Sequence, residues 1–248
     1  MSDNWDFYFL RVDDKPASIF VDLGIAREAP IKTLPFMAYI RVYMKTPRSD
    51  GLSSQEEFDA LRLIERAIED VLVDGDKTLY VGRNTTDGVR DFYFYMAQAQ
   101  DWDSRAKALM ASFSTYEFDS GCRGDPEWKT YFAFLYPSDA NRQRIENRRL
   151  CDVLQERGDP LTERREIDHW AYFPGAGARS AFIEQAAKLG YLLRSTREPE
   201  KPGDRFGAQL FRIDVPALDA IDDVTLPLFE LATALGGDYD GWETQVIT

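Results

Sequence analysis

The chain contains a single histidine, His169, and this residue limits the chemistry that the sequence can support. A metal site built from several histidines is impossible, and a Ser–His or Cys–His nucleophile would have to use His169. The residue lies in Ile167-Asp168-His169-Trp170, which has the pattern of a strand. Ser180 and Cys151 could pair with it, but neither lies in a glycine elbow or near an oxyanion-hole motif. We therefore interpret His169 as structural and predict no catalytic residue.

A glycine-containing segment, Gly175-Ala176-Gly177-Ala178-Arg179-Ser180, lies between an expected strand and an expected helix. A dinucleotide-binding loop occupies this position in a strand–turn–helix unit, but here Ser180 replaces its third glycine. The acidic residue expected about 20 positions later could only be Glu198, in a predicted loop. We predict an ordinary turn and no cofactor. The alternative is a small-ligand site or active site in a cleft between two domains, formed by His169, Gly175, Gly177 and Ser180.

The sequence also contains no cysteine or acidic motif with the spacing of a metal site. The two cysteines, Cys122 and Cys151, form no CxxC motif, and we expect free thiols. The segment Asp238-Tyr239-Asp240-Gly241 begins like a calcium loop, but it lacks the bidentate acid that such a loop needs at its twelfth position. We predict no metal site.

The residues from 213 to 248 include eight Asp or Glu and neither Lys nor Arg. Within them, Trp242 follows a turn, and a Trp in such a position is a common anchor at protein interfaces. An acidic face attracts basic proteins and repels nucleic acid. We therefore predict a partner-binding surface formed by Asp222, Asp223, Asp238, Asp240 and Trp242. The other interpretation is that the acids are solvated and that Trp242 packs in a core.

The composition describes a folded protein that lacks the charge for binding nucleic acid directly. Of its 248 residues, 44% are hydrophobic, and the formal net charge is −13, whereas phosphate contacts need clustered Lys and Arg. Apolar runs are short and interrupted by charge, so no membrane-spanning segment is expected. No signal peptide is visible. We expect a cytoplasmic protein that binds another protein.

Hydrophobic periodicity divides the chain near residue 137. The first part predicts strands, a helix after the capping box Ser53-Ser54-Gln55-Glu56, a hairpin, a second helix and further strands. Its last strand is expected over Trp128–Tyr136. This order suits two helices on one side of a mainly antiparallel sheet.

The second part predicts a basic helix over 139–157, followed twice by strand–helix–strand. Its last helix is expected near Leu226–Leu235, with Pro227 in the first turn. Strand–helix–strand repeated in this way is the split βαβ arrangement of a ferredoxin-like fold. We predict an α+β protein with two ferredoxin-like α/β sandwich domains and antiparallel sheets, over residues 1–137 and 138–248.

Four segments of the second part carry a resemblance in their order and spacing: Leu154 through Gly158-Asp159-Pro160, then Ile167-Asp168-His169, Ala186-Ala187-Lys188-Leu189-Gly190-Tyr191 and Tyr239-Asp240-Gly241-Trp242. Through them, residues 141–248 resemble the RraB family, the bacterial regulators of ribonuclease activity B. The resemblance implies an acidic ferredoxin-like protein that binds ribonuclease E and restrains its cleavage of RNA without being a nuclease. The predicted partner is ribonuclease E or another basic protein.

The first part carries a second resemblance through Trp5-Asp6-Phe7-Tyr8, Tyr80-Val81-Gly82-Arg83, Arg90-Asp91-Phe92-Tyr93-Phe94-Tyr95 and Asp125-Pro126-Glu127-Trp128-Lys129-Thr130-Tyr131. On these residues, 1–137 is similar to domain of unknown function 695. That family implies a fold and no activity.

Overall fold

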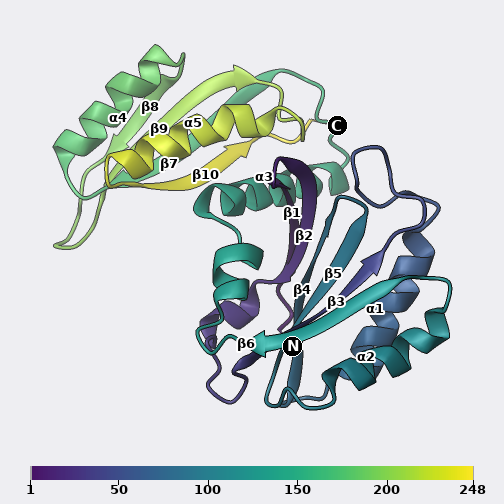
Figure 1. The fold of residues 1–248 in the computed structure, drawn as a ribbon. Coiled ribbons are helices and arrows are strands. Elements are labelled where there is room, and N and C mark those ends of the chain that lie inside the picture. The colour runs from purple at the N-terminus through teal and green to yellow at the C-terminus, as the bar shows by residue number, and fades with distance from the viewer. Residues whose placement is uncertain (1, 248) are drawn as a thin grey trace. The chain divides into compact units, whose positions relative to one another are not determined.

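The computed structural model describes residues 2–247. The chain divides into two compact units, Met1–Pro137 (unit 1) and Ser138–Thr248 (unit 2). Each unit is built on its own antiparallel sheet with helices packed against it (Figure 1). The predicted fold class, an α+β protein with two antiparallel sheets, is confirmed.

Unit 1 contains a six-stranded sheet in the order β1-β2-β4-β5-β3-β6, with every neighbouring pair antiparallel. Strands β3 to β6 and helices α1 and α2 have the strand order of a ferredoxin-like fold, and the β1–β2 hairpin extends the sheet beyond β4. In chain order, the elements are β1 (Trp5–Val12), β2 (Lys15–Asp22), η1 (Gly24–Arg27), β3 (Phe36–Tyr43), α1 (Phe58–Leu72), β4 (Thr78–Thr86), β5 (Val89–Met96), α2 (Trp102–Met110), η2 (Ala111–Phe113), β6 (Phe118–Gly124) and η3 (Tyr131–Leu135).

Alternating side chains give the sheet of unit 1 one face for its two helices. Ile40 and Val42 of β3 and Phe92 and Phe94 of β5 are buried on this face, because every second side chain of a strand points to the same side. The helices add Leu61, Ile64, Ile68, Leu72, Trp102, Ala106, Leu109 and Met110.

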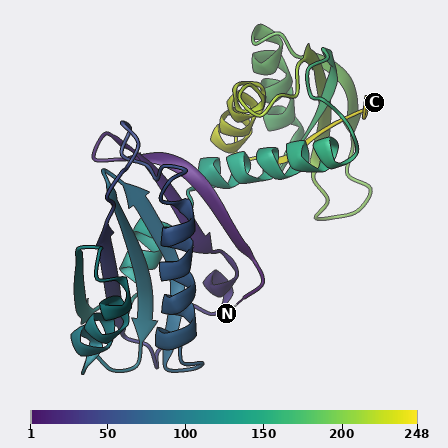
Figure 2. The same ribbon diagram turned by 90° about the vertical axis from the view of Figure 1, so that its right-hand side faces the viewer.

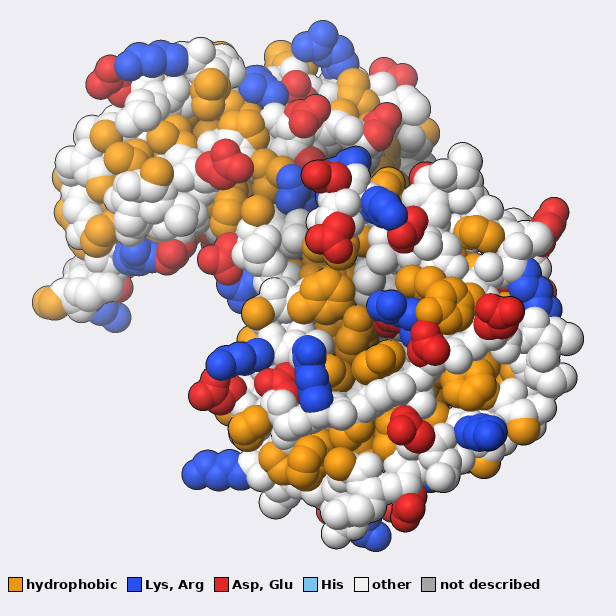
Figure 3. All heavy atoms as spheres, viewed as in Figure 1, with side chains coloured by type: hydrophobic (Ala, Val, Ile, Leu, Met, Phe, Trp, Pro, Cys, Tyr) orange, Lys and Arg blue, Asp and Glu red, His pale blue; other side chains and the backbone are white. Residues whose placement is uncertain are grey.

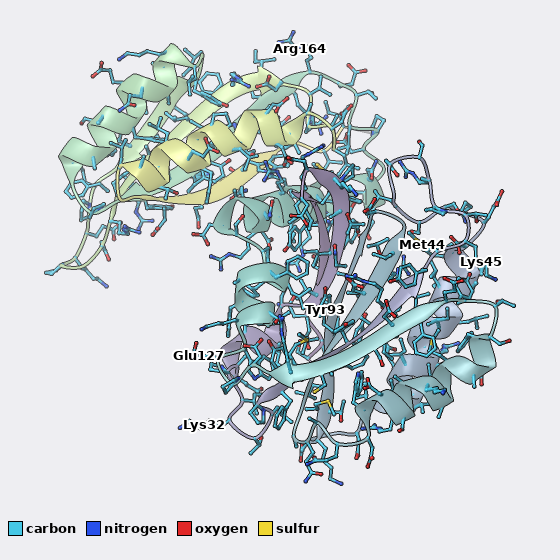
Figure 4. All side chains as sticks on the ribbon, in the orientation of Figure 1. Lys32, Met44, Lys45, Tyr93, Glu127 and Arg164 are labelled. Carbon is cyan, nitrogen blue, oxygen red and sulfur yellow. The ribbon has the colours of Figure 1, made fainter. Side chains whose placement is uncertain are left out.

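The opposite face of the same sheet carries a polar cluster beside aromatic rings. Arg41 donates two hydrogen bonds to Asp91, at 2.7 and 2.9 Å, and the hydroxyl of Tyr93 donates to the same carboxylate at 3.2 Å. Tyr93, labelled in Figure 4, also contacts Phe134 of η3 edge-on, with ring centroids 5.8 Å apart. Residues 131–135 therefore pack on this second face.

Two local predictions for unit 1 are wrong. The stretch 128–136 is not a strand but contains the π-helix η3. Its buried aromatic side chains, Trp128 and Tyr131, are three residues apart and do not follow the two-residue alternation of a strand. Trp128 stacks on Tyr95 with ring centroids 3.8 Å apart, and the Tyr131 hydroxyl donates to the carbonyl of Asp22 at 2.6 Å. The predicted capping box does not cap the first helix, because α1 begins at Phe58 with Glu57 as its N-cap residue and no side-chain cap bond. Ser54 instead accepts from the amide of Glu57 at 3.4 Å, in the turn before the helix.

Unit 2 contains a four-stranded sheet in the order β10-β7-β9-β8, again antiparallel throughout. Together with α4 and α5 this is the ferredoxin-like order, and α3 precedes it. The elements are α3 (Asp139–Glu156), β7 (Arg165–Phe173), α4 (Ala176–Lys188), β8 (Leu192–Arg197), β9 (Phe206–Asp214), α5 (Ile221–Ala234) and β10 (Asp238–Thr244).

All three helices of unit 2 pack on one face of its sheet (Figures 1 and 2). Ala171 and Phe173 of β7 are buried with Phe182 of α4 and Leu228 of α5. A second cluster joins α3 to the same face through Cys151, Leu154, Ile167, Val224 and Trp242. The sheet therefore has one face that forms the core and one that its own helices leave uncovered.

Helix α5 begins at Ile221 and not near Leu226, so Pro227 lies inside the helix and not in its first turn. Proline has no N–H to donate to the carbonyl of Asp223, one turn earlier. Asp223 is exposed, so water can reach that region of the backbone. Burial of Leu228 and Ala232 in the core supports the helix beyond the proline.

A buried ion pair fixes the C-terminal end of unit 2. Arg165 donates to Asp159 at 2.6 Å, with their side chains 7% and 0% exposed. The same carboxyl group accepts from the amides of Leu161 at 2.8 Å and Ile247 at 2.9 Å. Burial raises the pKa of Asp159, but these two backbone bonds and the charge of Arg165 outweigh it and leave the pKa below its usual range.

The Asp159→Asn substitution should lower the free energy of unfolding by about 3–5 kcal/mol at pH 7, because Arg165 is left buried without a counter-charge. Since the folded-state pKa of Asp159 is depressed, its contribution is present above the unfolded pKa of about 3.9 and is lost as the pH falls through the folded pKa. In urea unfolding, the free energies of unfolding of the wild-type and Asp159→Asn proteins should converge as the pH is lowered from 7 to 3. A difference that stays constant over this range would contradict the role of the ion pair.

Candidate functional site

Trp242 lies in the core of unit 2. Its side chain is 7% exposed and packs with Cys151 and Leu154 of α3 and Val224 of α5. It pairs with His169 across β10 and β7, so both side chains face the helices. The expectation that Trp242 anchors a partner is therefore corrected, because strand alternation points its indole inward.

Asn147 connects α3, α5 and β10 through its side-chain amide. Its Nδ2 donates to Asp222 at 2.7 Å and to Thr225 at 2.6 Å, and its Oδ1 accepts from the indole of Trp242 at 3.0 Å and from Gln143 at 2.9 Å. Asn147 is 1% exposed, and buried polar groups need such partners. The sequence gives no sign of the role of Asn147, because only the packing of α3 shows that this side chain faces inward.

The four acidic candidates do not form one cluster. Asp222 and Asp223 lie in the first turn of α5, whereas Asp238 follows the end of α5 and begins β10. Asp222 is also 3.5 Å from Arg144 of α3, and Asp238 forms an ion pair with Arg205.

Asp223 and Asp240 are exposed, and neither has an ion pair with a described residue. Acidic and basic side chains are interspersed over the visible face of each unit (Figure 3).

His169 is buried and neutral. Its Nδ1 lies 2.8 Å from the hydroxyl of Tyr239, and its ring contacts Tyr191 edge-on. Burial lowers the pKa of His169 to about 3, and the positive charge of Arg212 acts in the same direction. Its Nε2 has no hydrogen-bond partner among residues 2–247. The side chain therefore fills the core and is poorly placed to meet a substrate.

The residues of the alternative ligand site do not come together. His169 is buried in the middle of β7, whereas Gly175 caps α4, and Gly177 and Ser180 are exposed within α4. An added Cβ at Gly175 or Gly177 would meet no atom within 4 Å, so neither glycine marks a close approach of the backbone.

Burial raises the pKa of the Cys151 thiol to about 11, which makes it a poor nucleophile at neutral pH. Within residues 2–247, no group of three or more His, Cys, Asp or Glu is arranged to hold a metal ion. None of the described helices has both the length and the hydropathy that a membrane crossing requires.

The face of the unit 2 sheet that lies opposite its helices carries a further set of side chains that was not predicted from the sequence. The side chains on this face alternate with core residues along β7 and β9, and three of them are aromatic: Trp170, Tyr172 and Phe211. Three acids share this face near the start of β7 and the end of β10: Glu166, Asp168 and Glu243. The alternation of buried and more exposed residues over 165–173 was the feature of the sequence that could have indicated this second face.

Protein-family models match each unit. Residues 3–136, more than half of the chain, match the family described as "Family of unknown function (DUF695)". The chain belongs to the DUF695 family. Residues 144–244 of this DUF695 protein match the family described as "Regulator of ribonuclease activity B" (RraB), from α3 through β10. Both resemblances expected from the sequence are confirmed.

No curated protein matches the DUF695 chain. Similar solved structures include an unknown protein from Galdieria sulphuraria, with 12% identity, coverage of 86% of this chain and 99% of that chain, and a TM-score of 0.24. Another is described as a candidate glycine cleavage system transcriptional repressor, with 9% identity, coverage of 85% and 98%, and a TM-score of 0.26. TM-scores this low do not establish a shared fold, and the ferredoxin-like assignment follows from the strand order of this chain.

The Trp242→Ala substitution should destabilise the protein by about 3–5 kcal/mol, because it empties a core position and removes a donor from Asn147. Trp242→Phe, which keeps a ring but loses the N–H, should cost less. Urea unfolding followed by circular dichroism measures both. A loss below about 0.5 kcal/mol in Trp242→Ala, typical of surface positions, would place Trp242 outside the core.

His169 should stay neutral in the folded protein from pH 8 to pH 5, because its pKa is lowered to about 3. The imidazole nitrogen shifts of this single histidine can be followed by NMR without assignment. In urea the same signals should titrate near pH 6.5. Below pH 6.5 the unfolded chain binds a proton at His169 and the folded protein does not. This difference should lower the free energy of unfolding by about 1.4 kcal/mol per pH unit. A folded-state midpoint between pH 6 and 7 would contradict the burial of the ring.

Proposed function

We propose that this protein is a non-catalytic regulator that acts by binding another protein, with a ribonuclease of the ribonuclease E type as its partner. The observation that carries the proposal is the RraB match, which extends from α3 through the whole ferredoxin-like part of unit 2. The RraB family is described as a regulator of ribonuclease activity. Unit 1 supports no specific role in this proposal, because its family has no described activity.

Charge supports a basic partner. The protein has a formal net charge of −13, and unit 2 presents exposed acids at Asp223, Asp240 and Glu243. Such surfaces mainly speed association with oppositely charged proteins, and salt screens the attraction. We do not expect this protein to bind RNA directly, because acidic surfaces repel phosphate.

The state of the reactive side chains supports action by contact and not by catalysis. His169 is neutral and engaged with Tyr239, and Cys151 is buried with a raised pKa. We therefore expect unit 2 to act by binding another molecule on its surface. We also propose a cytoplasmic location, where the free thiols Cys122 and Cys151 would stay reduced.

The test is a cleavage assay with purified ribonuclease E from the host and a single-stranded RNA substrate. Adding the full-length protein should lower the initial cleavage rate in a saturable way, and the tagged protein should retain the ribonuclease on a column. Raising the salt from about 50 to 300 mM should weaken retention, because the Debye length shortens. An unrelated protein of similar size and net charge serves as the control. No retention together with an unchanged cleavage rate would refute the proposal.

A further inference from the structure

We propose that the uncovered face of the unit 2 sheet binds an arginine-rich segment of a partner protein, and that Arg194 holds this surface in the free protein as an internal competitor. This inference rests on the proposed function, which calls for a basic partner, and it names the surface and the side-chain chemistry. The surface is formed by Glu166, Asp168, Trp170, Tyr172, Phe211 and Glu243, called here the acidic–aromatic face.

Strand alternation explains why aromatic rings lie on this face. Trp170 of β7 lies between His169 and Ala171, both buried on the helix side, so its indole points the other way. Trp170 is half-buried, and Gly241 pairs with it across β10. Gly241 has a φ of +122°, and an added Cβ there would meet no atom within 4 Å. Gly241 therefore places no side chain next to Trp170 on this face.

Three carboxylates lie at one end of this face. Glu166, Asp168 and Glu243 line a hollow of about 500 Å³. Arg165 also lines this hollow, but its guanidinium is paired with the buried Asp159. Glu243 is exposed and has no ion pair with a described residue.

Arg194 of β8 shows how this surface holds a guanidinium group. Its Nε and Nη2 each donate at 2.5 Å, to Asp168 and Glu166 respectively, and its Cζ lies 4.4 Å from the ring centroid of Phe211. A planar guanidinium can reach two carboxylates and stack on a ring at once, which a lysine ammonium cannot. The face therefore suits arginine and discriminates against lysine.

The position of Arg194 makes its displacement feasible. Its side chain is 36% exposed, and exposed ion pairs contribute little stability. Exchanging Arg194 for an arginine of a partner leaves Asp168 and Glu166 paired as before. Additional arginines could then pair with Glu243 and stack on Trp170, which Arg194 does not contact in any described interaction. The partner therefore gains contacts that the internal arginine does not make.

The same charges disfavour a nucleic acid on this face. The carboxylates of Glu166, Asp168 and Glu243 line the hollow, and carboxylates repel phosphate. Of the two arginines near it, Arg165 is neutralised by Asp159 and Arg194 is paired with Asp168 and Glu166. Arg197 lies farther along β8, but it is 3.4 Å from Glu200 and partly neutralised. A basic polypeptide is thus the occupant that the charges favour.

The first test measures binding of a fluorescent peptide with alternating Arg and Gly to the full-length protein by anisotropy at low salt. A lysine–glycine peptide of equal charge is the matched ligand, and it should bind about fivefold more weakly. Equal affinity for the two peptides, or tighter binding of a single-stranded RNA of the same length, would overturn the proposal.

The second test separates this face from the helix side of unit 2. Glu243→Arg should weaken binding of the arginine peptide about tenfold, whereas Asp223→Arg, an equal charge change in the first turn of α5, should change it less than about threefold. Glu243→Gln, a milder change, should weaken binding in the same direction. Thermal melts confirm that each variant is folded. If Asp223→Arg weakens binding and Glu243→Arg does not, the proposed face is wrong.

The third test concerns the internal competitor. Arg194→Gln should tighten binding of the arginine peptide about threefold, because Asp168 and Glu166 are released. Arg157→Gln, an equal charge change at the end of α3, should leave the affinity unchanged. An Arg194→Gln variant that binds no better than Arg157→Gln would refute the competitor role.

These outcomes can be told apart from those of the ribonuclease assay. If the wild-type protein restrains cleavage and Glu243→Arg restrains it equally, the proposed function stands and the acidic–aromatic face is wrong. If the peptide results hold while the cleavage rate never changes, the face stands and the ribonuclease partner is wrong.

Discussion

The two-residue alternation of side chains along β7 is the constraint on which the rest of unit 2 depends. One set of positions, including Ile167, His169 and Phe173, is buried beneath three helices. The intervening set, including Asp168 and Trp170, points to the uncovered face. A shift of one residue in register would exchange the two sets, so the packing of the core also determines which groups a partner can meet.

Polar side chains inside unit 2 reinforce this division. Asn147 joins α3 to α5 and β10, and Asp159 joins Arg165 to the C-terminal backbone, so both tie the ends of the unit to its core. Part of the acidic C-terminal stretch is used in the same way, since Asp222 and Asp238 have basic neighbours within the unit. The acidic charge that remains for a partner is therefore smaller than the sequence suggests, and in this stretch it includes the exposed Asp223, Asp240 and Glu243.

Most of the fold follows from local sequence patterns. Helical and two-residue periodicities predicted the ferredoxin-like order of unit 2, because amphipathic elements must bury one side. The sequence did not indicate the direction of Trp242, since a bulge between Tyr239 and Gly241 shifts the register of β10. The π-helix at 131–135 was also missed, because a run of aromatic residues reads equally well as a strand. The uncovered face depends on where α3, α4 and α5 pack, which is a tertiary property.

The most direct measurement of the central claim is oxidative footprinting of the full-length protein with and without ribonuclease E, read by mass spectrometry. Trp170 and Tyr172 should lose reactivity on binding, whereas Phe9 of unit 1, which is 60% exposed, should react as before. Protection confined to unit 1, or no protection at any position, would contradict the account in which unit 2 binds a basic partner through its uncovered sheet face.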